Sequence, residues 1–473
     1  MMGDVEGVAK ILANAQDVSL PPGLGPVDER ADLSPEFHPT ELALADATAE
    51  IIRLSGGRTI YAGDGFRSFN GESFPKDPDN GPVQELMKAM VRLRGDAWKP
   101  ADRQRMERRA SISGALALLS SVPGVVVKRT DLDQHDLLLP CKGGVTVDLD
   151  SGRPRPSSPG DRMTKCAGVA PDFDMHTPIW IATLMQFAGG DEEVVRFLQL
   201  LVGYFLTGST KEQKLFYLVG RGGTGKSTFV EILRRLLGEF AAMTEAATFA
   251  EHKHEPHPAA LAAIEGARLV IAPEFEGRKL DASKVKAFTG DGVLSVRGMR
   301  ENFRQSPVKA KLLMVGNAEP QLRTVDEAIR RRFVLIPFNH VPTKADPGLV
   351  EKIWTEAPGI MAWAVRGALE WIEEGLYLPE AIIRASADYL DDQDSFGTWV
   401  RDFLDLSDCT AFTSSSDLFA NWKLHADGLN EQSGTQKALS ARLRRFGLVS
   451  SQRRWNGTIT RGWEGCRLRS GAQ

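Results

Sequence analysis

The sequence predicts a multidomain α/β protein, with a parallel sheet in the middle, a mixed α/β and helical region before it and a small module after it. Three observations support this prediction. The chain has 473 residues, several times the usual domain size, so it can hold more than one core. Apolar strands alternate with helical patterns over residues 209–345. The last residues show a separate pattern of one helix followed by two strands.

Composition narrows the class of protein. A net charge of -4 excludes a globally basic nucleic-acid coat, although local basic patches can still bind DNA. The four cysteines are far apart and lack CxxC spacing, which disfavours a zinc ribbon or a disulfide framework and fits a reducing cytosol. No signal-peptide pattern or membrane-length apolar run is found. We therefore expect a cytoplasmic protein with no membrane partner.

Segments rich in proline, glycine and acidic residues divide the rest of the chain. Residues 1–46 contain "SLPPGLGPVDERADLSPEFHPT", which is typical of a flexible segment. Residues 47–208 mix helical and strand patterns, such as "PVQELMKAMVRLRG" and "PGVVVKR", and form the expected N-terminal domain. Residues 346–394 are predicted to be a helical segment ending in the acidic linker "DYLDDQD". Residues 395–473 form the predicted C-terminal module.

The strongest motif is "GRGGTGKST", which fits the pattern GxxxxGK[ST]. An apolar strand, "LFYLVG", precedes it, and a helix with regularly spaced apolar residues follows it. Glycines allow backbone N–H groups to close around phosphates at a helix N-terminus. Lys226 can reach the outer phosphates, and the Ser227 hydroxyl can bind magnesium. We therefore predict a site for ATP and Mg2+ formed by Gly220, Gly222, Gly223, Thr224, Gly225, Lys226, Ser227 and Thr228.

Polar residues follow the neighbouring strand patterns. The strand in "ARLVIAPEFEG" ends in Glu274 and Glu276, which we assign to water activation, with Glu274 also a magnesium ligand; Glu276 could instead be an exposed loop acid. The strand in "KAKLLMVGN" ends in Asn317, which is suited to sensing the terminal phosphate. "TVDEAIRRRFVLIPF" places three arginines before a fourth strand, where one could reach a neighbouring subunit's nucleotide. Without the other motifs, a solvated helix end would be the favoured interpretation.

Together these motifs resemble the phage and poxviral primase-helicase family, whose ATPase part is an AAA+ core of the superfamily III helicase type. The segments that carry the resemblance are "KEQKLFYLVGRGGTGKST", "RLVIAPEFEGRKLDASKVKAFTG", "KLLMVGN" and "DEAIRRRFVLIPF", and it covers roughly residues 120–345. It implies that Arg331 and Arg332 match the family's arginine pair, while Arg330 replaces a residue that is often bulky and apolar. The order "TGDG" departs from the family's usual "TGGD", which puts the role of Asp291 in doubt.

The resemblance implies an ATP-driven DNA helicase that moves 3′ to 5′ during replication of a phage, prophage or plasmid, in the cytoplasm of a bacterial host. The expected assembly is a homo-oligomer in the form of a hexameric ring. Its expected partners are single-stranded and forked DNA, with a separate primase or polymerase. The chain is also expected to begin after the family's primase domain. Two alternatives belong to other classes. One is a P-loop ATPase that remodels protein or acts as a regulatory switch, and the other is a phosphotransferase.

Basic residues in two places are the expected DNA contacts. In the family, a hairpin between the acids and the asparagine tracks one DNA strand, and here the matching segment offers Lys286, Arg297 and Arg300. In the C-terminal module, "TQKALSARLRRFGLV" and two strands about an Asn-Gly turn predict a winged helix. Its local basic excess suits a duplex or fork, although protein docking remains an alternative. The candidate contacts there are Arg444, Arg445, Arg453 and Arg454.

Two further patterns do not support a site. "VTVDLDSGRP" places Asp148 and Asp150 as a primer-synthesising centre would, but a hairpin turn explains the segment better. "EHKHEPHP" contains three histidines without the spacing of further ligands, so we expect a polar loop there instead of a metal site.

Overall fold

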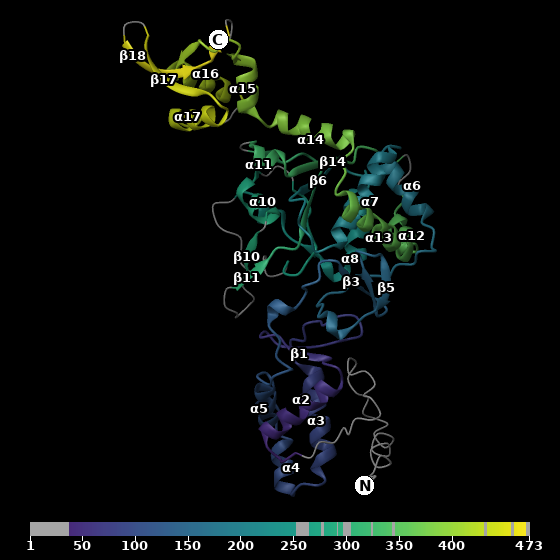
Figure 1. The fold of residues 1–473 in the computed structure, drawn as a ribbon. Helices are drawn as coiled ribbons and strands as arrows, with labels where there is room; N and C mark the ends of the chain where they lie inside the picture. The colour runs from purple at the N-terminus through teal and green to yellow at the C-terminus, as the bar shows by residue number, and fades with distance from the viewer. Residues whose placement is uncertain are drawn as a thin grey trace.

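A computed structural model describes residues 37–251, 264–275, 279–290, 292–296, 304–322, 325–342, 346–429, 433–455 and 458–469. Figure 1 shows three parts in sequence: an N-terminal unit of short helices, a central α/β body, and a C-terminal unit at the far end of helix α14. The mixed α/β architecture with a parallel sheet in the middle agrees with the prediction. Among the described residues, no helix has the length and apolar character needed to cross a bilayer.

The body is built on a five-stranded sheet whose strands are all parallel. The strands lie in the order β14-β6-β12-β8-β7, which places the strand before the glycine-rich loop inside the sheet. Strands β6, β8 and β12 are buried along their whole length, as expected for apolar strands covered on both faces. The bounds are β6 (Leu215–Val219), β7 (Ala241–Met243), β8 (Leu269–Ala272), β12 (Lys311–Gly316) and β14 (Phe333–Pro337).

Helices cover both faces of this sheet (Figure 1). Successive residues of a strand point to opposite faces, so Phe216 and Leu218 belong to one core while Leu215 and Tyr217 belong to the other. The first core contains residues from α6 (Pro178–Phe187), α7 (Glu192–Leu206), α8 (Lys226–Leu237), α12 (Leu349–Trp354) and α13 (Ala357–Glu374). The second contains residues from α10 (Ala282–Thr289) and α14 (Glu380–Asp392).

The N-terminal unit has its own apolar core, but its boundary differs from the predicted one. Its core joins α2 (Glu41–Leu54), α3 (Gly81–Gly95), α4 (Pro100–Met106) and α5 (Arg109–Leu119), beside the β1 (Thr59–Tyr61) and β2 (Phe66–Ser68) hairpin. Residues 139–206 instead share the core of the body, including the sheet of β3 (Leu138–Cys141), β4 (Val145–Asp148) and β5 (Arg153–Pro156). A boundary at residue 208 therefore cuts through one core, because apolar α7 packs against α13 and the sheet.

The segment predicted as a flexible lead-in also ends earlier than residue 46. Helix α2 begins at Glu41, and the Thr40 side chain caps it by accepting a hydrogen bond from the Ala43 N–H at 3.2 Å. Leu44 and Ala45 are fully buried. Residues 1–36 lie outside the described residues.

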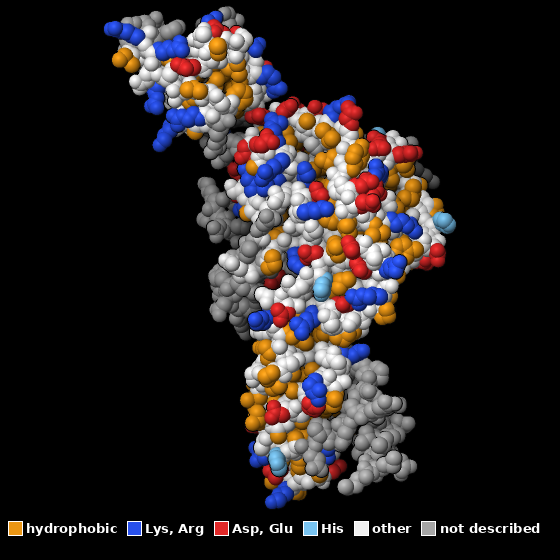
Figure 2. Space-filling view, in the orientation of Figure 1, with side chains coloured by type: hydrophobic (Ala, Val, Ile, Leu, Met, Phe, Trp, Pro, Cys, Tyr) orange, Lys and Arg blue, Asp and Glu red, His pale blue; other side chains and the backbone are white. Residues whose placement is uncertain are grey.

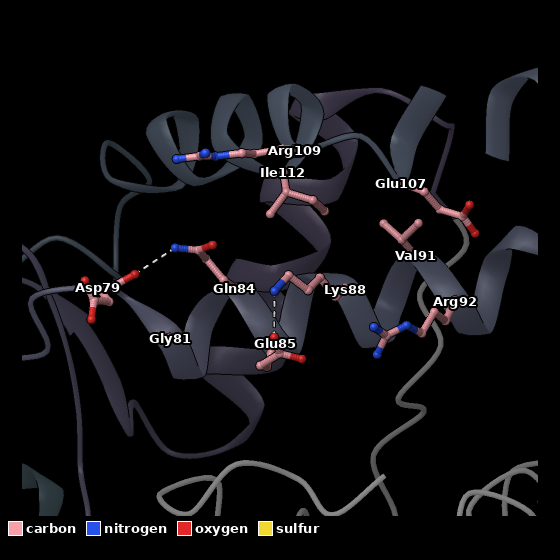
Figure 3. A pocket seen from close by; sticks show the side chains of 10 residues that line it. All are labelled: Asp79, Gly81, Gln84, Glu85, Lys88, Val91, Arg92, Glu107, Arg109 and Ile112. Atoms are coloured by element: carbon pink, nitrogen blue, oxygen red, sulfur yellow. Dashed lines mark hydrogen bonds and ion pairs between the residues drawn. The ribbon is translucent and has the colours of Figure 1, made fainter. Parts of the chain in front are cut away.

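A hollow of about 820 Å³ lies in the N-terminal unit, between α3 and the start of α5 (Figure 3). Its charged lining residues have both signs: Lys88, Arg92 and Arg109 occur with Asp79, Glu85 and Glu107, and Lys88 pairs with Glu85 at 2.6 Å. The mixed charge does not favour any one class of ligand.

Most of the acidic segment "DYLDDQD" is helical: residues 388–392 end helix α14, and only Gln393 and Asp394 form the connection to the C-terminal unit. Tyr389 is buried, its ring lies 4.9 Å from the ring of Phe333, and its hydroxyl donates to the Pro320 carbonyl at 2.7 Å. The Leu335 N–H, on the outer edge of β14, donates to Ser386 Oγ at 2.9 Å. Helix α14 thus covers the side of the outermost strand, β14, that no other strand of the sheet pairs with. The acidic residues on the exposed side of α14 led to the linker prediction, so its packing on the sheet was not predicted from the sequence.

The C-terminal unit has its own core, with the buried Trp399, Trp422 and Trp463. A short connection, Gln393 and Asp394, joins it to α14. Its elements are α15 (Ser395–Phe403), β15 (Leu404–Asp405), β16 (Phe412–Ser414), α16 (Ser415–Gly428), α17 (Gln436–Arg445), β17 (Val449–Trp455), β18 (Thr458–Glu464) and β19 (Arg467–Leu468). Strands β17 and β18 are antiparallel neighbours after helix α17, as predicted. The Asn-Gly turn lies outside the described residues.

Short elements complete the body. They are β9 (Lys279–Leu280), β10 (Val293–Val296), β11 (Arg304–Pro307), β13 (Gln321–Leu322), α11 (Glu327–Arg330), and the 3-10 helices η1 (Arg129–Asp131), η2 (Pro159–Asp161), η3 (Gly238–Phe240) and η4 (Ala246–Phe249). Strands β4 and β5 form the hairpin that we expected at Asp148 and Asp150. The histidine-rich segment lies outside the described residues.

Candidate functional site

The glycine-rich loop joins β6 to α8, and two of its glycines are required by close packing. A Cβ atom on Gly220 would lie 1.9 Å from the Phe338 carbonyl oxygen. Gly225 has a left-handed backbone with φ of 92°, and a Cβ there would overlap an aromatic ring. In contrast, a Cβ atom on Gly222 or Gly223 would have nothing within 4 Å of it. The loop is therefore rigidly seated at both ends and accessible in the middle.

The side chain of Lys226 holds the loop together through hydrogen bonds to its carbonyl oxygens. Its ammonium donates to the carbonyl oxygens of Gly220 at 2.5 Å and Arg221 at 2.9 Å, and to Asn317 Oδ1 at 3.0 Å. Lys226 is buried, with 7% of its surface exposed. Two residues that the sequence placed at one site, Lys226 and Asn317, thus contact each other. A buried cation bound to neutral oxygens favours an approaching anion.

The first turn of α8 leaves its backbone donors accessible. The N-cap residue, Gly225, has no side chain to cap the first N–H groups. Ser227 is exposed, whereas Thr224 is buried and its hydroxyl donates to the Arg221 carbonyl at 3.0 Å. Thr228 is half-buried. The loop amides, the buried ammonium and the exposed Ser227 hydroxyl together fit a phosphate group with a bound cation.

Strand register brings the predicted acid and asparagine to the same sheet edge as the loop. Gly316, at the end of β12, pairs with Val219 of β6, and Ala272 of β8 pairs with Met314. Because all three strands are parallel, Glu274 and Asn317 follow strands that end beside the loop.

Glu274 is exposed and has a left-handed backbone, with φ of 56°. A non-glycine residue in this conformation is strained, and such strain often accompanies function. Glu274 lines a hollow of about 490 Å³ together with Met243, Thr244, Glu245, Ala246, Ala247 and Pro273. Glu245 therefore supplies a second carboxylate that sequence reasoning missed. Glu276 lies outside the described residues.

Tyr217 is another residue of this edge that the sequence analysis missed. Its hydroxyl oxygen lies 2.9 Å from the Phe275 carbonyl and 2.8 Å from the Ala318 carbonyl, so it joins the segments after β8 and β12. A Cβ atom on Gly316 would lie 2.2 Å from this oxygen, so glycine is needed there. The one available signal was a single hydroxyl within the otherwise apolar "LFYLVG".

The two predicted arginines lie at the opposite edge of the sheet. Phe333, the first residue of β14, pairs with Leu215, the first residue of β6, so Arg331 and Arg332 precede the strands instead of following them. Five residues of strand separate them from the loop, about 16 Å. Neither guanidinium is placed to serve the loop of its own chain.

The environments of these arginines differ. Arg332 is buried, and its guanidinium donates to Thr289 Oγ1 at 3.2 Å and to the Ala328 carbonyl at 3.0 Å. Burial lowers the pKa of this guanidinium from its ordinary value. The side chain of Arg331 is exposed, and its carbonyl accepts a hydrogen bond from Lys214 at 2.9 Å. Only Arg331 of the pair is therefore exposed enough to meet another molecule.

The predicted DNA contacts of the body divide into two groups. Strands β10 and β11 form an antiparallel hairpin, with Val296 opposite Arg304, at the side of the body below α10 (Figure 1). Arg297 and Arg300 belong to its connection and lie outside the described residues. Lys286 forms an ion pair with Asp326 at 2.6 Å, so a role in binding DNA would compete with this pair.

In the C-terminal unit, Arg444 and Arg454 are exposed. Arg453 is engaged with its own chain: it pairs with Glu464 at 3.2 Å and donates to the Thr410 carbonyl at 3.1 Å. The side chain of Arg445 lies outside the described residues. Figure 2 shows several Lys and Arg side chains gathered around this unit.

Comparisons with known proteins find families and relatives that match parts of this chain. Residues 218–332, which include the loop, the acid strand and both arginines, match a family of unknown function (DUF5906). Residues 50–189 match the family described as D5 N terminal like. A protein named "Putative helicase L207/L206" from Acanthamoeba polyphaga mimivirus is 24% identical over 319 residues, which cover 62% of this chain and 33% of the relative. The chain thus spans about a third of the length of that curated relative.

Solved structures of the NrS-1 C-terminal region are also similar. The A form apo structure has 12% sequence identity and a TM-score of 0.47, covering 90% of this chain and 99% of that chain. An apo structure of residues 305–718 of the same region has 11% identity and a TM-score of 0.46, with the same coverage.

Proposed function

From the premise that this chain belongs to the phage and viral primase-helicase family, we propose that it is an ATP-driven DNA helicase for the replication of a phage, prophage or plasmid, assembled as a hexameric ring that moves 3′ to 5′. The observation that carries the proposal is the contact of Lys226 with Asn317 at one sheet edge, with Arg331 exposed at the other. In an oligomer whose active sites lie between subunits, one subunit supplies the phosphate-binding loop and its neighbour supplies an exposed arginine.

The sheet is assigned to the AAA+ type of superfamily III helicases, with a strand order that reads 5-1-4-3-2 along the chain. In this assignment, the N–H groups of Gly222 to Thr224 and the Lys226 ammonium bind the ATP phosphates. Ser227 and Glu274 hold Mg2+, which when bound neutralises charge on the outer phosphates. Asn317, held by Lys226, orients the attacking water. Glu274 accepts the proton of that water.

The arginine that completes the site comes from the neighbouring subunit. We assign this role to Arg331 because its side chain is exposed, whereas that of Arg332 is buried and bound to Thr289. Arg332 then supports the helix end from which Arg331 projects. A guanidinium at the outer phosphate stabilises transition-state charge and contributes about a thousandfold or more to the rate.

Two DNA contacts follow from the same proposal. The β10–β11 hairpin, with Arg297 and Arg300 in its connection, tracks the phosphates of one strand. The order α15, β16, α16, α17, β17, β18 supports a winged helix, in which exposed Arg444 and Arg454 face a duplex or fork.

The decisive experiment measures ATP hydrolysis with and without single-stranded DNA, and displacement of a strand from a fork, on protein whose oligomeric state is determined in the same buffer. Single strands should stimulate hydrolysis. Arg297→Ala combined with Arg300→Ala should retain basal hydrolysis and lose both stimulation and displacement, because these residues bind DNA and not ATP. Exposed Lys352→Ala is the matched control for lost charge. Stimulation by a protein instead of DNA would favour a remodelling ATPase, and transfer of phosphate to an acceptor would favour a phosphotransferase.

A further inference from the structure

The short helix α11 is held from two sides, immediately before the exposed Arg331. On one side it is tied to α10, through the ion pair of Asp326 with Lys286 and the hydrogen bond of Arg332 to Thr289. Helix α10 leads into the β10–β11 hairpin within a few residues. On the other side Arg330, the last residue of α11, reaches the end of α14. This helix therefore lies between the proposed DNA hairpin and the C-terminal unit.

Arg330 binds two carboxylates on different elements. One terminal nitrogen of its guanidinium lies 2.8 Å from Asp391 Oδ1, and the other lies 3.1 Å from Asp394 Oδ2. The planar fork of a guanidinium fixes direction as well as charge, and a lysine cannot reproduce it. The three residues are only partly exposed: the Arg330 side chain is 32% accessible and that of Asp394 is 20% accessible.

The two carboxylates belong to different parts of the molecule. Asp391 is in α14, which is packed on β14 as part of the body. Asp394 is the N-cap of α15, and its second oxygen accepts a hydrogen bond from the Gly397 N–H at 2.9 Å. Because the C-terminal unit has its own core, the residues between α14 and α15 are the natural hinge between the two parts. Arg330 thus spans this hinge.

We propose that Arg330 is a positioning residue: its guanidinium clamps the C-terminal unit to the body and thereby sets the position of Arg331, the next residue in the chain. The inference rests on the proposed function, since Arg331 is assigned there to the neighbouring subunit's nucleotide. A change in the orientation of the C-terminal unit, as when it binds DNA, moves Asp394 and so reaches the arginine finger through a single side chain. This gives a physical reason for a charged residue where the related family often has an apolar one.

The test compares kcat with KM in the full-length protein. Partly exposed ion pairs contribute little to stability, so Arg330→Gln should fold and assemble. A catalytic group displaced by about 1 Å can cost up to a hundredfold in rate, so we expect kcat for ATP to fall roughly tenfold or more, with KM changed less than about twofold. Arg330→Lys should recover only part of the rate, because lysine keeps the positive charge but lacks the planar fork that fixes the direction of both contacts. Arg384→Gln, which breaks an exposed pair with Glu380 on α14, is the matched control.

A second variant keeps the helix cap while removing the clamp. In Asp394→Asn, the amide oxygen can still cap α15, but the charge that binds Arg330 is lost. Its kcat should fall as in Arg330→Gln, and the double variant should be no worse than either single one, because both remove the same contact. Additive losses would overturn the inference.

A distance measurement separates this inference from the proposed function. Cys409 is the exposed native cysteine of the C-terminal unit, while Cys141, Cys166 and Cys466 are buried. A spin label there, with a second label introduced by Glu373→Cys on α13, reports the orientation of the unit without any nucleotide. The distance distribution should be narrow in the parent protein and broad with Arg330→Gln. An unchanged distribution overturns the clamp. If the parent protein hydrolyses no ATP, the proposed function fails, while this distance still decides whether Arg330 holds the hinge.

Discussion

The two edges of the central sheet both contain buried cations, but the surroundings of those cations differ. At the carboxyl edge, Lys226 donates to the oxygens of its own loop, with open space beyond Gly222 and Gly223. At the amino edge, Arg268 and Lys311 are each 3% exposed and donate to the carbonyl oxygens of Leu206 and Thr207, where helix α7 ends.

This difference separates chemistry from structure. The last carbonyls of a helix carry partial negative charge and lack intrahelical partners, so enclosed cations satisfy them and fasten α7 to the sheet. The first turn of α8 presents the opposite partial charge to open space, where an anion can bind. A buried cation is therefore no sign of a site by itself. A buried cation indicates a binding site only where a ligand can reach it.

The largest expected effect is at the carboxyl edge. Lys226→Ala should reduce ATP hydrolysis to background and weaken nucleotide binding, because in the proposed site the ammonium binds the phosphates before and during reaction. Glu274→Gln should still bind nucleotide but not hydrolyse it, because an amide oxygen can still bind Mg2+ whereas an amide cannot accept the proton of the water. Steady-state hydrolysis and equilibrium binding of a fluorescent ATP analogue distinguish the two. Normal turnover by Glu274→Gln would move the catalytic role to Glu276 or Glu245.

The second effect tests whether the two edges cooperate between subunits. Arg331→Ala should assemble and bind ATP while its kcat falls by roughly a thousandfold, because the lost guanidinium acts only in the transition state. Mixing Arg331→Ala with Lys226→Ala protein should restore partial hydrolysis, since some interfaces then pair an intact loop with an intact arginine. An active monomer, or mixtures no better than their components, would contradict sharing of the site.

Arg332→Ala is the companion variant for that experiment. Because Arg332 is buried and bonded within its own chain, its loss should lower thermal stability as well as kcat, unlike the loss of Arg331. If Arg332→Ala loses kcat as strongly as Arg331→Ala does, with stability unchanged, Arg332 is the arginine that completes the neighbouring site. Circular dichroism melts alongside the kinetic assay make the distinction.

A smaller effect is expected at Tyr217, which joins the strands of the carboxyl edge. Tyr217→Phe removes the hydroxyl that serves the Phe275 and Ala318 carbonyls. The loss should cost about 1–3 kcal/mol of the free energy of unfolding, because the single phenolic hydrogen that these two buried carbonyls share is removed. We also expect kcat to fall, since Glu274 and Asn317 follow the joined segments. Urea unfolding and hydrolysis rates measure the two consequences, and an unchanged kcat would limit Tyr217 to a structural role.

The smallest effect sharpens the assignment of the amino edge to structure. Burial holds the pKa of the Lys311 ammonium well below its ordinary value of 10.5. Between the lowered pKa and 10.5, the unfolded chain binds this proton more readily than the folded chain does. The free energy of unfolding should therefore rise with pH across that window, by at most about 1.4 kcal/mol per pH unit, and this contribution should level off above it.

Lys311→Met removes the titrating group and should flatten that part of the pH dependence. Urea unfolding at a series of pH values below 10.5 measures the slope. Exposed Lys352→Met is the matched control, and it should leave the slope unchanged. An equal slope in Lys311→Met and the parent protein would show that another group titrates.

Those parts of this protein that depend on short-range patterns could be predicted from its amino-acid sequence. The strand, loop and helix around Lys226 follow from an apolar run, closely spaced glycines and helical periodicity within about twenty residues. Glu274 and Asn317 were identifiable because each comes directly after an apolar strand, and parallel strands bring their ends to one edge. The C-terminal helix and its two strands followed from periodicity in the same way.

Which residues are buried, and what they contact, depends on how distant segments pack in the folded chain. The acids of α14 resemble a linker in sequence, yet Tyr389 and Leu390 are buried on the sheet edge. Arg330, Arg331 and Arg332 are consecutive and chemically identical, but one spans a hinge, one is exposed and one is buried. Burial and hydrogen-bond partners come from segments far apart in the chain, here α10, α14 and α15. The residues next to each arginine in the sequence therefore do not predict its partners. Burial and hydrogen bonding distinguish an arginine that supports the fold from one that can reach another subunit.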